Sequence, residues 1–395
     1  MGYDYPNLYD ESIPMLWASR LVYSFAELLE EGRSGKLDLK DTFPPEVLAK
    51  YKDKRLDVRD LNDGNGLPFN TVAKILKANE EKLKEVASDE YEYDLEIIKK
   101  LQAKEDADES SDRYFLETFS SIDAATQCVY GVLKDDYNKR VTVVFRGSTT
   151  GGTRDWETNL SATLEEMKTP KLLRDNLEGS RKKRVLVHCG FYEYLFNNKR
   201  AKGEQRYDMI LDDIKPFVEK GYKIYVTGHS LGAALSSLLA FKLAGSDLSW
   251  IPKPITCINY ASPLVGSEGF RTAFTLLEKM GLIRCLRVTN DCDFVPTVPP
   301  LSLGLKKRTM KHVGINLRLT SNSFILSHPN SNGLGIVNAW RNSLLKPVWS
   351  VLYYHSPKVH NERMDMHKEA LQNMHLNDLY ADEKLVGNIY TKLIF

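Results

Sequence analysis

The sequence predicts an α/β fold in which a mostly parallel central sheet is flanked by helices. Short apolar runs rich in β-branched residues, bounded by Gly, Asn or Ser, alternate with longer segments of helical periodicity. Such alternation from about residue 114 onward is typical of strands joined by helical crossovers. The runs expected as strands are 141–145, 222–227, 255–261 and 284–288. The intervening helices include 207–220 and 230–244.

The first 110 residues follow a different pattern, which predicts a helical extension or cap. Apolar residues recur at the spacing of one helical face over 13–31 and 68–86, and an acidic stretch over 90–101 is compatible with a third helix. Residues 104–113 (KEDADESSDR) have almost nothing to bury, so we expect an exposed linker there. The expected organisation is therefore an N-terminal helical extension over 1–110 and an α/β domain over 111–395.

Composition excludes several classes of protein. The 395 residues include 54 Lys+Arg and 53 Asp+Glu, a formal net charge of +1, which gives no reason to expect a nucleic-acid partner. No run approaches the roughly 18 apolar residues of a membrane span, and the N-terminus lacks the features of a secretory signal. The five cysteines lack CxxC spacing and several lie in apolar runs, so we expect buried free thiols and a cytoplasmic location.

The strongest chemical signal is the segment Gly228-His229-Ser230-Leu231-Gly232. An expected strand leads into it and a helix of small residues follows, which is the setting of a nucleophile elbow. Glycines flank Ser230 because the turn is tight and the neighbouring backbones crowd each other. A serine hydroxyl is a weak nucleophile at neutral pH, so this motif predicts a serine hydrolase that places a base near Ser230.

An orienting carboxylate is expected just past the end of a later strand. The segment that follows the run 284–288 offers two candidates, Asp291 and Asp293. The residues alone leave both open.

Four stretches together resemble the class 3 lipases, the family of the fungal triacylglycerol lipases and their plant and algal relatives. They are 143–148 (VVFRGS), 187–191 (VHCGF), 228–232 (GHSLG) and 293–300 (Asp-x-Val-Pro-x-x-Pro-Pro), in the order of that family. The resemblance spans about residues 120–315 and implies an α/β-hydrolase fold that cleaves esters without a cofactor. It also selects Asp293 over Asp291, because the acid of the family directly precedes the apolar-Val-Pro step.

The resemblance assigns the backbone N–H groups of Ser148 and Leu231 to an oxyanion hole. Ester hydrolysis passes through a tetrahedral oxyanion, and two preorganised donors stabilise it.

The histidine of the triad is the least determined member. In the family it follows the acid by some tens of residues and opens a terminal helix, a setting that His355 in His-Ser-Pro-Lys-Val-His fits best. His360 stands where the family has a tyrosine, so His360 and His367 stay open as alternatives. The spacing of these three histidines is not a metal-ligand pattern, and we expect no catalytic metal.

A candidate lid follows the oxyanion residue Ser148. Trp156, Leu160, Leu164 and Met167 would form one apolar stripe on a helix, and the family places its lid at this point. A plain surface helix packed on the core is the alternative.

These features predict a serine hydrolase that releases fatty acids from tri-, di- or monoacylglycerols through an acyl-enzyme. Such an enzyme would make peripheral contact with a membrane or lipid-droplet surface. A phospholipase, galactolipase or polar-ester esterase with the same triad is one alternative, and a non-catalytic lipase-like binding protein is another. The presence of Ser230, Asp293 and Ser148 argues against the non-catalytic alternative.

Overall fold

The chain divides into two compact units that interleave along the sequence. Unit 1 comprises Met1–Leu16, Gly147–Gln205 and Val226–Phe395, and unit 2 comprises Trp17–Arg146 and Arg206–Tyr225. Unit 2 runs across residue 110, and the domain boundary expected there stays a prediction. The structure is a computed structural model, and it describes residues 5–33, 66–81, 84, 90–106, 114–120, 128–148, 163–174, 184–196, 205–297, 310–328 and 353–381.

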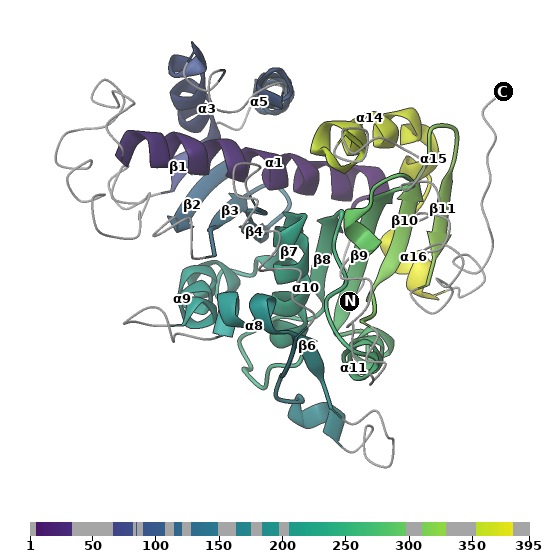
Figure 1. The fold of residues 1–395 in the computed structure, drawn as a ribbon. Coiled ribbons are helices and arrows are strands. Elements are labelled where there is room, and N and C mark those ends of the chain that lie inside the picture. Colours follow the sequence, from purple (N-terminus) through teal and green to yellow (C-terminus); the bar gives the residue numbers. More distant parts are fainter. Residues whose placement is uncertain are drawn as a thin grey trace. The chain divides into compact units, whose positions relative to one another are not determined.

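Unit 1 is built on a largely parallel set of strands (Figure 1). β8 (Ile255–Tyr260), β9 (Ile283–Asn290) and β10 (Ile315–Leu319) run parallel, and β11 (Phe324–Ser327) is antiparallel to β10. The end of β7 (Lys223–His229) lies beside β8. Every residue of β8 and β9 is buried, the two arginines of β9, Arg284 and Arg287, included.

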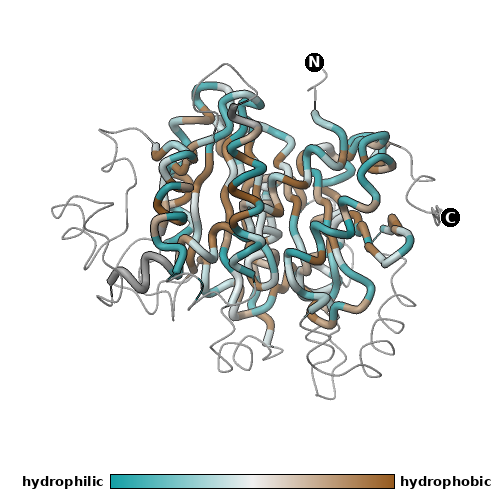
Figure 2. The backbone as a smooth tube through the Cα atoms, turned by 90° about the horizontal axis from the view of Figure 1, so that it is seen from above, coloured by the Kyte–Doolittle hydropathy of each residue, from teal (hydrophilic) through white to brown (hydrophobic). Residues whose placement is uncertain are grey.

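Helices cover these strands, and hydrophilic and hydrophobic residues are interspersed along the backbone tube (Figure 2). α10 packs against β8 and β9, α11 packs against β9, and α14 contacts β9 and β10. The α/β fold predicted from the sequence is therefore confirmed. The helices that the structure describes wholly within unit 1 are α8 (Cys189–Phe196), α10 (Leu231–Ala244), α11 (Glu268–Lys279), α14 (Pro357–Met366), α15 (Lys368–Gln372) and α16 (Leu376–Ala381), with the 3₁₀ turns η3 (Lys171–Leu173) and η4 (Val295–Thr297).

Unit 2 combines helices with antiparallel strands. Its strands β1 (Leu67–Pro68), β2 (Tyr114–Ser120), β3 (Tyr130–Asp135) and β4 (Arg140–Phe145) pair in chain order. Its helices include α3 (Phe69–Ala78), α5 (Tyr91–Asp106), α9 (Arg206–Val218) and the part of α1 (Leu8–Arg33) from Trp17 onward. A buried bidentate ion pair of Arg20 with Asp94, with both distances 2.7 Å, joins α1 to α5.

The predicted N-terminal helices correspond to α1, α3 and α5, although α3 ends earlier than the periodicity over 68–86 suggested. α5 continues to Asp106, so the first residues of the expected linker 104–113 are helical. The remainder of that linker lies outside the described residues.

The first residues of α1 belong to unit 1 and are tied to it by hydrogen bonds. The backbone N–H of Leu8 donates to the carbonyl of Met374 at 2.7 Å, and the hydroxyl of Tyr260 donates to the carbonyl of Ser12 at 2.6 Å. Glu11 is fully buried and forms an ion pair with Arg284 of β9. The first turns of α1 are therefore an integral part of this unit.

Two further expectations concern cysteines and membrane spans. The cysteines are free thiols; Cys189 is half-buried and the other four are buried, in agreement with the expectation from their apolar surroundings. Among the helices that the structure describes, none combines the length and apolar character needed to cross a membrane.

Candidate active site

Ser230 occupies the sharp turn between β7 and α10. Its backbone has φ 58° and ψ −125°, a conformation that is unfavourable for a residue with a side chain. The backbone N–H of Ser230 donates to the carbonyl of Tyr260 at 3.0 Å, which ties the turn to the end of β8. This strand–turn–helix geometry is that of a nucleophile elbow.

Gly228 is required by the close approach of two backbone segments in this turn. A Cβ atom at Gly228 would lie 2.4 Å from the carbonyl carbon and oxygen of Gly232, far inside van der Waals contact. The first turn of α10 therefore packs directly on the last residues of β7, and no larger residue fits between them.

His355 and Asp293 form a buried pair in the same unit. Nδ1 of His355 lies 3.0 Å from Oδ2 of Asp293, and the exposed fractions of the two residues are 8% and 1%. The other carboxylate oxygen, Oδ1, accepts a hydrogen bond from the backbone N–H of Val295 at 2.9 Å. Asp293 thus fixes the turn after β9 and at the same time orients the imidazole.

His229 brings His355 to the elbow. Nε2 of His229 lies 2.7 Å from the carbonyl oxygen of His355, so the proton of His229 is on Nε2. The two imidazole rings are 4.5 Å apart between centroids. Because His229 directly precedes Ser230, this contact places the His355 backbone beside the nucleophile turn.

The two candidate carboxylates have different partners. Asp293 contacts His355, whereas Oδ1 of Asp291 lies 2.8 Å from Nη1 of Arg363 on α14. Asp291 is therefore engaged in an ion pair, and the geometry of an orienting acid is found at Asp293.

The alternative histidines have other surroundings. His360 is fully buried, and burial lowers its pKa to about 4, so it is neutral at physiological pH. His367 lies between α14 and α15 with its ring 5.4 Å from that of Phe324, and burial lowers its pKa as well. Asp293 is paired with neither of them; its imidazole partner is His355.

The predicted oxyanion residues lie at two segment ends. Ser148 follows β4 and is half-buried, and Leu231 is the first residue of α10 and also half-buried. The N–H of Leu231 belongs to the first turn of a helix, where backbone donors have no partner inside the helix. The oxyanion-hole assignment stays a prediction.

The candidate lid is only partly described, and its helical stripe needs a correction. Trp156 and Leu160 lie outside the described residues. Leu164 begins strand β5 (Leu164–Glu166), which pairs antiparallel with β6 (Leu186–His188), and the backbone N–H of buried Met167 donates to the carbonyl of Val185 at 2.8 Å. The helix predicted to continue through Leu164 and Met167 is wrong, because the backbone there pairs with a segment some 20 residues away.

Sequence reasoning missed several polar residues around the pair of His355 and Asp293. Asn290, at the end of β9, and Arg363, on α14, contact the segments that carry the pair. A polar residue at the end of a buried strand is a signal that could have pointed to Asn290, whereas nothing in the local pattern marks Arg363.

Taken together, these residues can support nucleophilic catalysis. An imidazole held by a buried carboxylate can accept a proton from a serine hydroxyl in the nucleophile turn. In the part of the chain that the structure describes, no three His, Cys, Asp or Glu side chains are grouped to hold a metal ion.

Comparison with known proteins agrees with this chemistry. Residues 142–303 match the family model for "Lipase (class 3)", a segment that includes the elbow and Asp293. Among curated proteins, the phospholipase A1-II 6 of Oryza sativa subsp. japonica is 34% identical over 151 residues, which is 34% of this chain and 35% of the relative. Phospholipase A1-IIgamma of Arabidopsis thaliana is 36% identical over 139 residues, or 31% of this chain and 32% of the relative.

The matches to these curated relatives cover about a third of their length. Among solved structures, the triacylglyceride lipase of Rhizomucor miehei is 23% identical, with a TM-score of 0.39, over 53% of this chain and 67% of that structure.

Proposed function

This chain belongs, through residues 142–303, to the class 3 lipase family, and we propose that it is a serine hydrolase that releases fatty acids from acyl lipids. The observation that carries the proposal is the buried hydrogen bond of His355 to Asp293, held beside the elbow of Ser230 by His229. The matched family and the names of the curated relatives support the same reaction class.

In the proposed mechanism, Oγ of Ser230 attacks the ester carbonyl and its proton passes to Nε2 of His355. Asp293 keeps the imidazole oriented and stabilises its charged form. The backbone N–H groups of Ser148 and Leu231 bind the oxyanion of the tetrahedral intermediate. His355 then protonates the departing alcohol, which leaves an acyl-enzyme on Ser230. Water, deprotonated by His355, attacks the acyl carbonyl, the bond to Oγ of Ser230 breaks, and His355 returns the proton to that oxygen as the fatty acid leaves.

Acylglycerols are the substrate expected from the sequence. A phospholipid acyl ester is the second candidate, because the curated relatives reported above carry the name phospholipase A1. Both substrates present the same carboxylic ester to Ser230, so the triad alone does not separate them.

The proposed substrates gather in membranes and droplets, so we propose that the enzyme works in peripheral contact with such a surface in the cytoplasm. The substrate class supports the contact with a lipid surface, and the five free cysteines support the cytoplasm. Sedimentation or flotation of the purified protein with phosphatidylcholine vesicles and with trioleoylglycerol emulsions tests it, and recovery of all protein in the lipid-free fraction with both would reject it.

A substrate panel tests the reaction itself. Fatty-acid release is measured from tri-, di- and monooleoylglycerol, phosphatidylcholine and monogalactosyldiacylglycerol, with Ser230→Ala as the control for contaminating activity. Release by the wild-type protein from at least one acyl lipid, absent with the control variant, is expected. Equal release by both proteins, or none from any substrate, would overturn the proposal.

A further inference from the structure

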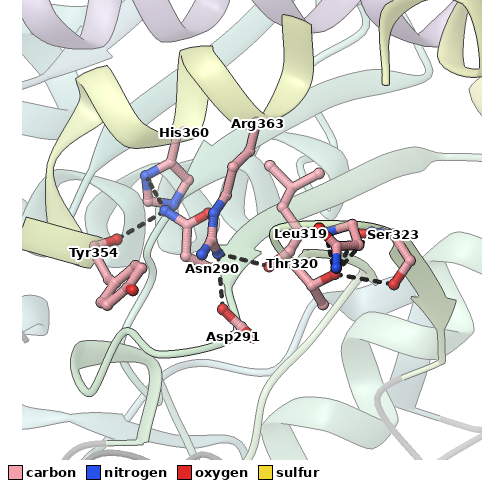
Figure 3. Close-up of polar contacts among 9 residues, drawn as sticks. Asn290, Asp291, Leu319, Thr320, Ser323, Tyr354, His360 and Arg363 are labelled. Atoms are coloured by element: carbon pink, nitrogen blue, oxygen red, sulfur yellow. Dashed lines mark hydrogen bonds and ion pairs between the residues drawn. The ribbon is translucent and has the colours of Figure 1, made fainter. Parts of the chain in front are cut away.

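A polar network joins the segment that carries Asp293 to the segment that carries His355 (Figure 3). Its centre is the side-chain amide of Asn290, the last residue of β9. Nδ2 of Asn290 donates to the carbonyl oxygen of Tyr354 at 2.7 Å, and Oδ1 accepts from Nη1 of Arg363 at 3.3 Å. Because one end of the amide donates and the other accepts, its orientation is fixed.

Arg363 holds three acceptors with a single nitrogen. Besides Oδ1 of Asn290, its Nη1 lies 2.8 Å from Oδ1 of Asp291 and 3.0 Å from the carbonyl oxygen of Leu319, at the end of β10. The Arg363 side chain is buried, with its guanidinium 5.0 Å from the centroid of the Tyr354 ring. One cation on α14 therefore connects the ends of β9 and β10.

His360 completes the network. Its Nδ1 lies 3.0 Å from Nδ2 of Asn290, and in the tautomer that carries its proton on Nε2 this Nδ1 accepts a hydrogen of the amide. The carbonyl of Ser356 lies 3.0 Å from the same Nδ1, a contact that only the other tautomer could use. The second hydrogen of the Asn290 amide therefore points toward His360 on α14, five residues after His355.

The network lies where it can fix the position of the two segments that carry Asp293 and His355. Asn290 stands three residues before Asp293, and the Tyr354 carbonyl that it holds belongs to the residue directly before His355. The hydrogen bond from Asn290 to the Tyr354 carbonyl therefore fixes the distance between two backbone segments. One segment carries Asp293 and the other carries His355, whose side chains are 3.0 Å apart. The backbone N–H of Asp293 also donates to the carbonyl of Asn290 at 3.3 Å, and the side chains of Asn290 and Arg363 bond to backbone carbonyls of the segments around the pair.

We propose that Asn290 and Arg363 are positioning residues that hold His355 in register with Asp293 and so set the basicity available to Ser230. The inference rests on the proposed function. A misplacement of catalytic groups by about 1 Å can lower a rate by about 10²-fold. Loss of either residue is therefore expected to lower kcat by about 10–100-fold while KM changes little, because substrate binding does not use these side chains.

Three variants separate the contacts. Arg363→Met removes all three Nη1 contacts, whereas Arg363→Lys keeps one nitrogen that can meet the same acceptors. Asn290→Asp keeps an acceptor for Arg363, and the ion pair that results is expected to preserve the fold. The second carboxylate oxygen faces the Tyr354 carbonyl, so the hydrogen bond to Tyr354 is lost.

A matched control is available on the same strand. Arg284 is a buried arginine of β9 that contacts Glu11, Thr256 and Asn377, away from the network. Arg284→Gln is expected to lower the amount of folded protein without changing the rate of each folded molecule.

The experiment is active-site titration with a fluorescent alkyl fluorophosphonate. Oγ of Ser230 forms a bond to phosphorus, fluoride leaves, and the serine proton passes to His355, so the labelling rate reports activation of the serine without a lipid surface. The end point counts folded sites, and the rate per site measures positioning. Mass spectrometry of the labelled peptide, with Ser230→Ala as a blank, assigns the label to Ser230.

We expect Arg363→Met and Asn290→Asp to label about 10–100-fold more slowly per site, Arg363→Lys to recover most of that loss, and Arg284→Gln to label at the wild-type rate per site. Wild-type labelling at Ser230 together with unchanged rates per site in Arg363→Met and Asn290→Asp would overturn the positioning role alone. Absence of labelling at Ser230 in the wild-type protein would instead overturn the proposed function and the inference with it.

Discussion

Nδ1 of His355 lies 3.0 Å from Oδ2 of Asp293, and both residues are buried. The two residues are 62 positions apart in the sequence and meet where the turn after β9 faces the segment that precedes α14. A carboxylate in this position keeps the imidazole in the tautomer that presents Nε2 to a nucleophile.

The first prediction concerns this carboxylate. Asp293→Asn keeps the shape but removes the charge and the acceptor that fixes the tautomer, so kcat for a 4-nitrophenyl ester should fall about 10³–10⁴-fold. Asp291→Asn is the matched control, because Asp291 pairs with Arg363 and not with His355; its loss should not exceed the roughly 10–100-fold expected for the network of Arg363. Equal losses in the two variants would reject Asp293 as the orienting acid.

The second prediction concerns the pH dependence of stability. The pKa of His360 is lowered to about 4, mainly by burial, with Asp293, His355 and Arg363 as the charged or titratable groups around it. Between about pH 6.5 and 4 the unfolded state binds more protons than the folded state, so the stability is present above pH 6.5 and is lost as pH falls toward 4.

The size of this loss from His360 is about 3 kcal/mol. His360→Asn replaces Nδ1 with a non-titrating acceptor and should flatten the decline, measured by urea unfolding at a series of pH values. A wild-type decline that persists unchanged in His360→Asn would count against the buried neutral imidazole.

The third prediction concerns the tight turn. Gly228→Ala places a methyl group 2.4 Å from the backbone of Gly232, so the free energy of unfolding should fall by about 3 kcal/mol. Gly221→Ala is the control, since its Cβ would meet nothing within 4 Å and only its φ of 85° is costly, by about 1–2 kcal/mol. A Gly228→Ala protein as stable as Gly221→Ala would show that the elbow can relax.

The fourth prediction concerns the start of the chain. Glu11→Gln leaves the buried Arg284 without its counter-charge, so the free energy of unfolding should fall by about 3–5 kcal/mol. The exposed pair of Glu166 and Arg184 is the control, and Glu166→Gln should cost no more than about 1 kcal/mol. If thermal unfolding shows the same loss of stability in Glu11→Gln and Glu166→Gln, the ion pair of Glu11 with Arg284 does not stabilise the fold as a buried pair.

Features that depend on residues close together in the sequence could be predicted, and contacts between distant residues could not. The strands β8 and β9 and the helices α9 and α10 could be predicted because their periodicity and turn residues are local. The elbow at Ser230 could be predicted for the same reason. Asp293 and His355 needed the resemblance to a family, because nothing local in the sequence joins two residues 62 positions apart.

What could not be predicted is the pairing of distant segments. The apolar spacing of Leu164 and Met167 suits a helix, but the backbone there pairs with Val185–His188, a partner that no local pattern reveals. Arg363 has the pattern of an ordinary helix surface residue, and only the fold places it against the ends of β9 and β10. Side chains whose role is to hold other segments leave little trace in sequence periodicity.

Ser230 is the proposed nucleophile of an ester hydrolase. The most direct measurement compares turnover of 4-nitrophenyl butyrate by the wild-type protein and by Ser230→Ala, with both confirmed as folded by circular dichroism. We expect measurable turnover by the wild-type protein and a loss of at least about 10³-fold in the variant. Turnover that is unchanged in Ser230→Ala would contradict this assignment.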